Sequence, residues 1–475
     1  MTKRRILLRI GIFVLIFAVI LSSVTFVVKE KKYTFPTFSY FYKEPNNSLD
    51  VIFLGSSHML NAVSPLQLYN DYGIASHNCA QVGQPIFFNY ETLKETLKHQ
   101  HPKIVIVDIV SILWSIEPVW RIHLHRAIDD IPFSLSKYFF INDIYKDINS
   151  LLYAKNDVSL FEAYFPMYLY HSGWDKLKKN DFLKKKNLCK GIQLLYSNFK
   201  GICPQIIPIN NKLSLPSEMH KILNQIIETL NKENISLIFT VIPYDKSYMD
   251  IEKAQKYYNE IYWLVKNKNN VNLINYFHCY KDADFDFSKD LANIDHLNFY
   301  GVQKITAHLG KYIKENYDIP DRRLDPAYAK WNEDYKLYIQ DTFAQELNAT
   351  KDSEKYLELL TSKKEATDNT CIFIVKTSEK NIKSKHFETL GVNTTGNNYI
   401  AIIDGGKIMY NRTAYDVPLN HKYKIGNLPV KMVSDVKSNA SSIKIDGIEQ
   451  IKSKSGVTIV IYDKLLKKVT GVRSL

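Results

Sequence analysis

Cysteine is scarce in this sequence: five residues are scattered over 475 positions, and no two of them form a C-x-x-C pair. An odd, sparse set argues against a disulfide framework, and the missing pair argues against a zinc site. A helix-turn-helix pattern and an arginine-rich arm are also absent, so we do not expect nucleic-acid binding despite a formal net charge of +13. We expect no metal and no other cofactor.

Long apolar runs are equally scarce. Only residues 10–28 form an uncharged apolar stretch, and its length of about 19 residues is enough to cross a membrane. Four cations stand among the first nine residues, which predicts a cytoplasmic N-terminus (1–9), a single-pass anchor (10–28) and an extracellular remainder. A cleaved signal peptide is the alternative, but Leu21-Ser22-Ser23 is a poor cleavage site. We therefore expect a protein of the cell membrane.

Apolar residues are abundant. They make up 45% of the chain, and aromatic residues make up 13%, so the chain can bury substantial cores and general disorder is excluded. Its length suits two or three domains of roughly 100–200 residues each. The lysines are spread in small groups, which suits solubility near an anionic surface. An anionic cell-wall polymer as a partner is the alternative.

Residues 29–320 alternate apolar strands with amphipathic helices. Short β-branched runs without a polar face are typical of parallel strands that helices cover on both faces. The expected strands are 51–54, 104–109, 236–242 and 271–274, and the expected helices are 217–230, 252–266 and 302–313. This alternation predicts an α/β fold with a doubly wound, flavodoxin-like parallel sheet, whose ligands lie at the carboxyl ends of the strands.

Three regions depart from this pattern. Residues 120–215 are rich in Tyr, Phe and Lys, and we expect an irregular helical insertion over the sheet. Residues 321–368 are polar with helical stretches and should form a linker. From 369 to 475, short strands are divided by glycines, with turn signals at Asp404-Gly405-Gly406 and Asp446-Gly447. These signals predict a separate β-rich domain.

The first expected strand runs into the turn Gly55-Ser56-Ser57-His58, which places hydroxyl groups at a carboxyl end of the sheet. A serine hydroxyl is a weak nucleophile and needs an adjacent base and donors for the oxyanion. The candidate base is His296, in a loop before the last helix of the same domain. Such a loop can reach back over the sheet edge to the first strand's turn. Together the two motifs indicate serine-nucleophile chemistry.

Gly55-Ser56-Ser57 and Asp295-His296-Leu297-Asn298 together resemble the SGNH (GDSL-like) hydrolase superfamily, over about residues 45–316. The likeness is closest to its membrane-anchored bacterial branch, which includes the D-alanine-transfer protein of teichoic acid synthesis (DltD-like) and polysaccharide O-acetylation proteins. The resemblance implies Ser57 as the nucleophile and His296 as the base. It also implies an oxyanion hole made by the backbone N–H groups of Ser57 and Gly83.

Two positions depart from the family pattern. After the second core strand the family often has an asparagine as a further oxyanion donor, whereas this chain has Asp108 and no asparagine there. The family's acid usually stands three residues before the histidine, and this chain has Asn293 at that position. Asp295 orients His296 only if the loop is shaped differently, and Asp290 is a second candidate. A Ser–His dyad or an inactive site therefore stays an alternative.

Other histidines are open to more than one interpretation. His58 beside the nucleophile is either a substrate contact or a turn filler. His123 and His125 would point to opposite faces of a strand, so we do not expect them to share a metal.

The C-terminal region has a second resemblance. Residues 402–407, 438–449 and 454–464 resemble the ILEI/PANDER-type (interleukin-like EMT inducer) domain, over about residues 370–475. Some members of that fold bind glycans, so the resemblance implies a carbohydrate-docking role. A structural spacer is the alternative.

The sequence as a whole predicts an extracytoplasmic serine acyl-ester hydrolase or O-acyltransferase, acting through a Ser57 acyl-enzyme. The expected substrate is a cell-envelope polysaccharide or teichoic acid, and the expected membrane partner is an MBOAT-type O-acyltransferase. The alternative is a catalytically degenerate SGNH-fold protein that serves as a glycan-binding or assembly factor. The acyl group and its acceptor stay open.

Overall fold

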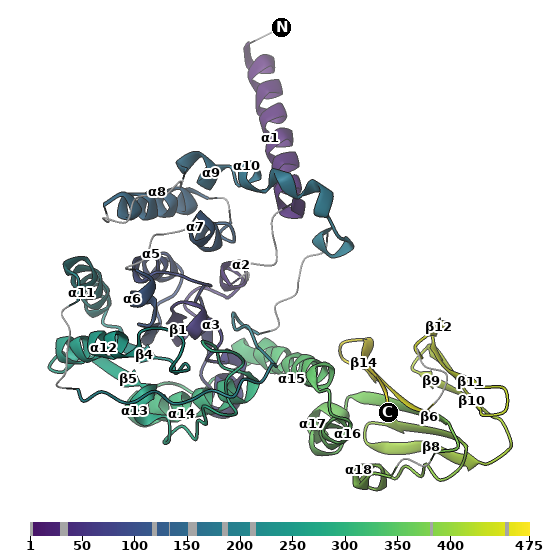
Figure 1. Cartoon of the computed structure of the whole chain (residues 1–475). Coiled ribbons are helices and arrows are strands. Elements are labelled where there is room, and N and C mark those ends of the chain that lie inside the picture. Colours follow the sequence, from purple (N-terminus) through teal and green to yellow (C-terminus); the bar gives the residue numbers. More distant parts are fainter. Residues whose placement is uncertain are drawn as a thin grey trace. The chain divides into compact units, whose positions relative to one another are not determined.

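The computed structural model describes residues 3–28, 37–115, 121–132, 134–150, 159–182, 189–209, 215–380, 383–451 and 456–475. They belong to two compact units, Met1–Asn332 and Glu333–Leu475. The first unit begins with the helix α1 (Lys3–Val28), and Figure 1 shows its elements along the chain. Within the described residues, α1 is the one helix long and apolar enough to cross a membrane.

The core of the first unit is a five-stranded sheet with the order β2-β1-β3-β4-β5, in which every neighbouring pair is parallel. Its strands are β1 (Val51–Leu54), β2 (Ser76–Asn78), β3 (Ile104–Asp108), β4 (Ser236–Val241) and β5 (Val271–Asn275). Every residue of β1 and β3 is buried, as expected for central strands covered on both faces. The predicted parallel α/β sheet is confirmed.

Helices surround this sheet, and their apolar stripes explain why. In α11 (Ser217–Lys232) the buried side chains recur at helical spacing from Met219 to Leu230, so one face packs inward while the other stays polar. The remaining helices of the sheet region are α2 (Phe38–Phe41), α3 (Ser57–Leu60), α4 (Pro65–Tyr72), α5 (Ile86–Leu97), α12 (Ile251–Val265), α13 (Tyr276–Cys279), α14 (Phe299–Asn316) and η3 (Pro326–Tyr328).

The segment for which an insertion is predicted, 120–215, consists of short helices followed by an extended stretch, with several parts outside the described residues. The helices that precede and form it are α6 (Ser111–Trp114), α7 (Arg121–Ile128), α8 (Leu135–Ser150), α9 (Leu160–Tyr164), α10 (Met167–Tyr170), η1 (His171–Lys176) and η2 (Lys179–Phe182). His123 and His125 belong to α7, so the expectation of a strand at these residues was wrong.

The second unit contains two antiparallel sheets, with the orders β14-β13-β6-β7-β8 and β12-β11-β10-β9. The predicted β-rich C-terminal region is therefore confirmed. The strands are β6 (Thr370–Thr377), β7 (Asn398–Asp404), β8 (Lys407–Ala414), β9 (Leu419–Ile425), β10 (Leu428–Asp435), β11 (Ala440–Ile445), β12 (Ile448–Glu449), β13 (Gly456–Asp463) and β14 (Lys468–Ser474).

Strand β6 shows how this unit is layered. Its alternate residues Ile372 and Ile374 pack with helical residues such as Leu357, whereas Phe373 and Val375 pack with residues of the other sheet. The helices are α15 (Ala329–Ala349), α16 (Ser353–Ser362), α17 (Lys364–Thr367) and α18 (Lys385–Thr389). Residues 321–368, for which the sequence predicts a linker, thus include helices that contribute to this core.

Candidate active site

The serine turn lies directly after β1. Ser56 caps the N-terminus of α3, its hydroxyl accepting a 3.4 Å hydrogen bond from the His58 N–H, and Ser57 is the first residue of the helix. A Cβ atom on Gly55 would lie only 2.8 Å from the Cβ atoms of Asp108 and Met59, so the close approach of β3 requires glycine here. Ser57 is 6% exposed and sits at the carboxyl edge of the sheet.

The loop before α14 supplies the histidine. His296 Nδ1 lies 2.9 Å from Asp295 Oδ1 and 3.2 Å from Asn293 Nδ2. Asn293 Oδ1 accepts hydrogen bonds from the backbone N–H groups of Asp295 and His296, so this side chain folds the loop around the histidine. The structure therefore places both Asn293 and Asp295 against the same ring nitrogen.

The chemistry of the two contacts separates their roles. A histidine that acts as a general base through Nε2 must have that nitrogen unprotonated. The proton of the neutral ring then resides on Nδ1, and this N–H group requires a hydrogen-bond acceptor. Asp295 supplies that acceptor, whereas the Asn293 amide nitrogen is itself a donor. Burial would raise the pKa of Asp295, but the hydrogen bond and charge of His296 outweigh burial and lower it, so the carboxylate stays ionised.

The carboxylate of Asp290, the other candidate acid, is bound by groups other than the histidine. Its Oδ2 accepts hydrogen bonds from Lys304 Nζ at 2.8 Å and from the Asp286 N–H at 2.7 Å. It is 2% exposed, and its carbonyl accepts from the Asn298 N–H. Asp290 therefore holds the loop in shape instead of orienting His296.

His58 connects the serine turn to the histidine loop. Its ring centroid lies 5.6 Å from that of His296 and 5.4 Å from that of Tyr248. Within the described residues, neither ring nitrogen of His58 has a hydrogen-bond partner, and the same holds for Nε2 of His296. Burial, followed by the charge of His296, lowers the pKa of His58 to about 3, so this ring is neutral. This neutral ring directly follows Ser57 in the chain and packs against His296.

Gly83 lies in the loop after β2. A hydrogen bond of 3.1 Å from the Gln81 N–H to the Gly55 carbonyl joins this loop to the serine turn. The φ of Gly83 is +66°, and a Cβ atom would lie 2.8 Å from His123 Nε2. Arg126 of the same helix donates to the Val82 carbonyl at 3.4 Å. Helix α7 thus packs over the loop that carries the expected oxyanion donor, a contact that the sequence pattern did not predict.

Asp108 is a second feature that sequence reasoning undervalued. It ends β3, is fully buried, and its Oδ1 accepts long hydrogen bonds of 3.4 Å from the Val110 and Ile242 N–H groups. Burial raises its pKa to about 8 in spite of these bonds and of the Ser56 side chain, so the carboxyl is mostly neutral at pH 7. The signal in the sequence is a lone carboxylate at the end of an apolar run, and the structure pairs this run with the strand that precedes the serine turn.

The raised pKa predicts a pH dependence of stability. Unfolded Asp108 titrates near 3.8 and folded Asp108 near 8, so the folded state holds an extra proton between these values. The free energy of unfolding therefore falls as the pH rises from about 4 to about 8, by up to ~1.4 kcal/mol per pH unit for this group. Asp108→Asn should remove that slope, measured as the unfolding midpoint at pH 5 and pH 8.5. Asp284→Asn, at an exposed carboxylate, should keep it, and an unchanged slope in Asp108→Asn would contradict the assignment.

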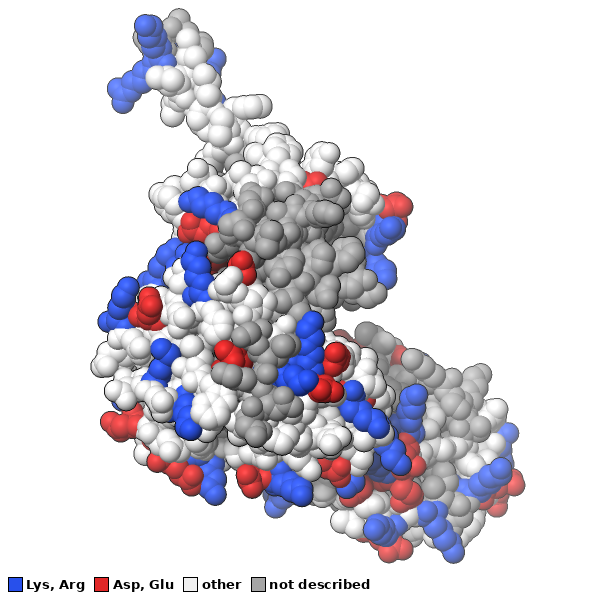
Figure 2. All heavy atoms as spheres, turned by 60° about the vertical axis from the view of Figure 1, so that its left-hand side comes forward, with Lys and Arg blue, Asp and Glu red and all other residues white. Residues whose placement is uncertain are grey.

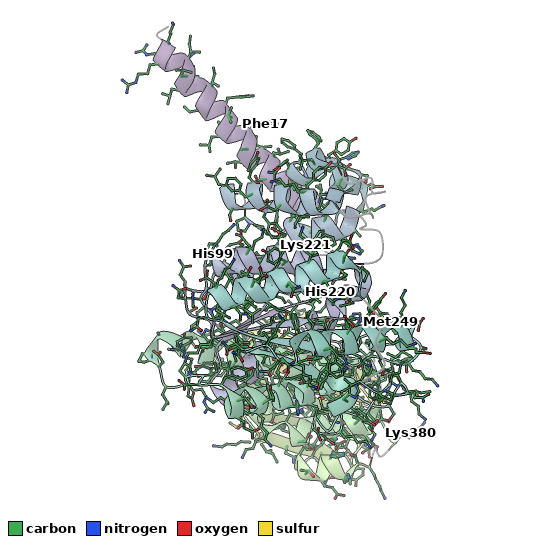
Figure 3. The ribbon with its side chains drawn as sticks, turned by 90° about the vertical axis from the view of Figure 1, so that its left-hand side faces the viewer. Phe17, His99, His220, Lys221, Met249 and Lys380 are labelled. Carbon is green, nitrogen blue, oxygen red and sulfur yellow. The ribbon has the colours of Figure 1, made fainter. Side chains whose placement is uncertain are left out.

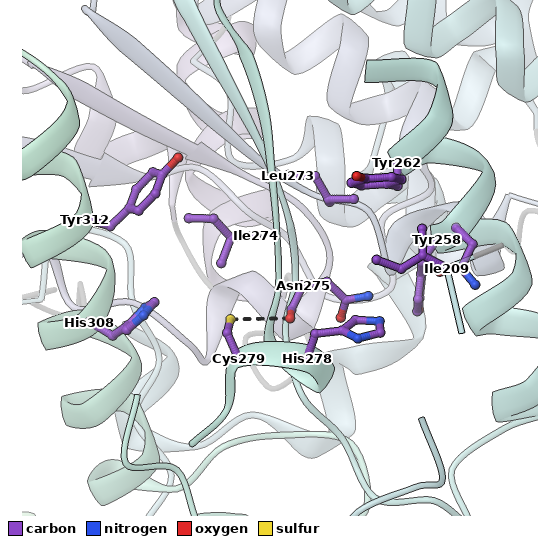
Figure 4. Close-up of a pocket in the computed structure, with 11 residues that line it drawn as sticks. Ile209, Tyr258, Tyr262, Leu273, Ile274, Asn275, His278, Cys279, His308 and Tyr312 are labelled. Atoms are coloured by element: carbon purple, nitrogen blue, oxygen red, sulfur yellow. Dashed lines mark hydrogen bonds between the residues drawn. The ribbon is translucent and has the colours of Figure 1, made fainter. Parts of the chain in front are cut away.

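A cavity lies apart from these residues. It has a volume of about 360 Å³ and follows β5 between α12 and α14, lined by Tyr258, Tyr262, His278, His308 and Tyr312 among others (Figure 4). Cys279 in its wall donates a 3.4 Å hydrogen bond to the Asn275 carbonyl. None of the predicted site residues lines it. No group of three metal-ligating side chains occurs within the described residues.

Comparison with known proteins gives little further information. No protein-family model matches the chain, and no curated protein matches it. Among solved structures, a protein from Streptococcus pneumonia assigned as a platelet activating factor aligns at 13% identity and a TM-score of 0.31, over 64% of this chain and 99% of its own. A family 3 carbohydrate esterase from Clostridium thermocellum aligns at 12% identity and a TM-score of 0.27, over 56% and 96%. Both TM-scores are low, so neither likeness indicates a function for this chain.

Proposed function

We propose that this chain is a membrane-anchored serine esterase or O-acyltransferase. The observation that carries the proposal is the pairing of His296 Nδ1 with the Asp295 carboxylate at 2.9 Å, with Nε2 left without a partner among the described residues. A histidine oriented in this way, packed against the residue that follows Ser57, is the arrangement that activates a serine hydroxyl.

In the proposed reaction, Ser57 Oγ attacks the carbonyl carbon of an ester while His296 Nε2 takes the hydroxyl proton. The N–H groups of Ser57 and Gly83 stabilise the oxyanion of the tetrahedral intermediate. Asp108 stands where the family has an asparagine, and its neutral carboxyl carries a hydrogen-bond donor as an asparagine amide would. The intermediate collapses to a Ser57 acyl-enzyme when the alcohol leaves with the proton of His296. Water or a sugar hydroxyl then accepts the acyl group.

The substrate class follows from the anchor and the resemblance. Helix α1 is apolar along its shaft and carries its cations at the free end, as Figure 2 shows. Four cations precede the apolar run and three lysines follow it (Lys29, Lys31 and Lys32), and this small excess supports a cytoplasmic N-terminus and a site on the outer face of the cell membrane. A tethered esterase suits an immobile substrate, so we propose a cell-envelope polysaccharide or teichoic acid, with an MBOAT-type O-acyltransferase as the membrane partner. Carbohydrate docking by the C-terminal unit stays a prediction.

A fluorophosphonate probe tests the enzyme directly, because it phosphonylates only a serine that is activated as a nucleophile. The full-length protein in detergent should gain one probe, located at Ser57 by peptide mass spectrometry, and Ser57→Ala should gain none. Ser64→Ala is the matched control, since Ser64 is also a buried serine at the start of a helix but lies outside the site; it should be labelled like the wild type. Absence of Ser57-dependent labelling would favour the degenerate, glycan-binding alternative.

A further inference from the structure

One face of α1 is covered by protein in its C-terminal half. Leu21, Val24, Thr25 and Val28, which share a face at helical spacing, are partly or fully shielded, while Ser22, Ser23 and Phe26 stay exposed. The covering segment is α9–η2, residues 159–182, which contacts α1 through α10, η1 and η2. A Cβ atom on Gly173 would lie 3.2 Å from the Val28 carbonyl oxygen, so the two backbones meet closely there.

The covering segment exposes a set of large aromatic side chains. Each of them is between 46% and 60% exposed, although a water-soluble surface seldom gathers so many: Phe161, Phe165, Tyr168, Trp174 and Phe182. Phe161 and Phe165 contact each other at 4.9 Å between ring centroids. With Tyr168 they line an apolar groove together with Phe17 and Leu21 of α1, and Figure 3 shows Phe17 where α1 meets these helices.

The position of this aromatic surface along α1 shows which part of a membrane it would contact. At ~1.5 Å per residue, Leu21 lies about 10 Å and Phe17 about 16 Å from Val28 along the helix axis. Half of a hydrocarbon core of ~30 Å is about 15 Å. Side chains that contact Phe17 and Leu21 therefore lie at the depth of the outer leaflet when α1 spans the membrane, whereas Trp174 beside Gly173 lies near its surface.

We propose that residues 159–182 form a membrane-embedded collar, which inserts Phe161, Phe165 and Tyr168 among the acyl chains of the outer leaflet and places Trp174 at the headgroup level. The inference rests on the anchoring of α1 in the proposed function. The segment is suited to this position because aromatic rings favour the membrane–water interface, and because its short helices make part of their backbone hydrogen bonds internally, as from the Ala163 N–H to the Ser159 carbonyl.

The charges of the collar favour lipid acyl chains over an electrostatic contact. Within residues 159–182, Glu162, Asp175 and Asp181 balance Lys176, Lys178 and Lys179, so the segment has no net charge to attract an anionic headgroup. Binding should therefore persist in a zwitterionic bilayer, in contrast to a polybasic surface segment.

The collar is also connected to the active site. Tyr170 of α10 donates a 2.8 Å hydrogen bond to Asp129, which in turn contacts His125 of α7 at 3.0 Å. The same helix carries His123, whose ring lies against Gly83. The collar thus fixes α7, and through it the oxyanion loop, relative to the membrane. A lipid-linked or membrane-delivered acyl donor is the substrate that such a fixed position favours.

Brominated acyl chains test the collar because they quench only tryptophans that lie at lipid depth. The full-length protein is placed in zwitterionic nanodiscs with and without brominated phosphatidylcholine. We expect quenching of the wild type and loss of most of it in Trp174→Phe. Trp263→Phe is the matched control, since Trp263 is 43% exposed but lies on α12, and it should keep the wild-type quenching. The double variant Phe165→Glu/Tyr168→Glu should also lose most of the quenching.

The outcomes separate the collar from the anchor. Resistance to carbonate extraction establishes that α1 spans the membrane. Extraction-resistant protein whose quenching is the same in wild type and Trp174→Phe would overturn the collar and leave the proposed anchor standing. Release by carbonate would overturn the anchor itself, and the collar with it.

Discussion

Replacing His296 with alanine should lower kcat for an acyl ester by about 10⁴- to 10⁶-fold, the largest effect we expect for any residue except Ser57. Without its Nε2, nothing in the described site takes the serine proton, since burial lowers the pKa of the neighbouring His58 to about 3. The remaining donors of the oxyanion hole can sustain only a residual rate. The measurement is hydrolysis of an aryl acetate by the full-length protein in detergent, compared with the wild type.

His308→Ala is the control for this variant. His308 is also only partly buried, and its ring contacts Tyr276 outside the serine site. Its kcat should stay within about threefold of the wild type, the range expected of a residue that stabilises no transition state. Equal losses in both variants would show that unfolding, and not proton transfer, explains the result.

Replacing Asp295 with asparagine should lower kcat by about 10²- to 10⁴-fold with little change in KM. An amide at this position offers a donor as readily as an acceptor, so Nδ1 loses its fixed proton and Nε2 is no longer free as the base. A loss of about 10⁴-fold in kcat is expected for a fully buried imidazole–carboxylate pair. The Asp295 side chain is 20% exposed, so we expect a smaller loss than that limit. Rates are measured with the same ester between pH 6 and pH 9.

Asp290→Asn distinguishes the two candidate acids. It weakens the bond to Lys304 and should therefore lower the unfolding midpoint, but kcat should fall less than about tenfold because Asp290 does not contact His296. A larger loss in Asp290→Asn than in Asp295→Asn would reverse the assignment and indicate a loop that rearranges when substrate binds.

The strands with continuous apolar residues were predictable, and so were the helices with one-sided stripes. Strand β2 was not, because its sequence Ser-His-Asn has no β propensity. It forms because it pairs with β1, and a hydrogen bond from His77 Nε2 to the Thr37 carbonyl at 3.1 Å gives one of its polar side chains a partner. Whether such a strand forms depends on its tertiary contacts, which its own sequence does not reveal.

Only those parts of the candidate site that lie in short local sequence motifs were predictable. The residues Ser57 and His296 stand in recognisable turns, but the choice among Asn293, Asp295 and Asp290 depends on how the loop folds. That fold is decided by a side chain: Asn293 Oδ1 accepts two backbone N–H groups and brings the Asp295 carboxylate to the imidazole. The contacts of α7 with Gly83 join segments 40 residues apart, which no periodicity within a single element encodes.

The base and its carboxylate are consecutive residues, and this adjacency has a kinetic consequence. A loop that opens to admit a bulky polymer carries Asp295 and His296 together, since one peptide bond joins them. Opening therefore changes the distance from Nε2 to the serine without breaking the imidazole–carboxylate bond. If closure of this loop limits turnover, solvent viscosity should slow kcat while the pH profile keeps its shape. Asp295 and His296 would then move together as one rigid pair. Access of the substrate and acid–base chemistry would be separable properties of the same short loop.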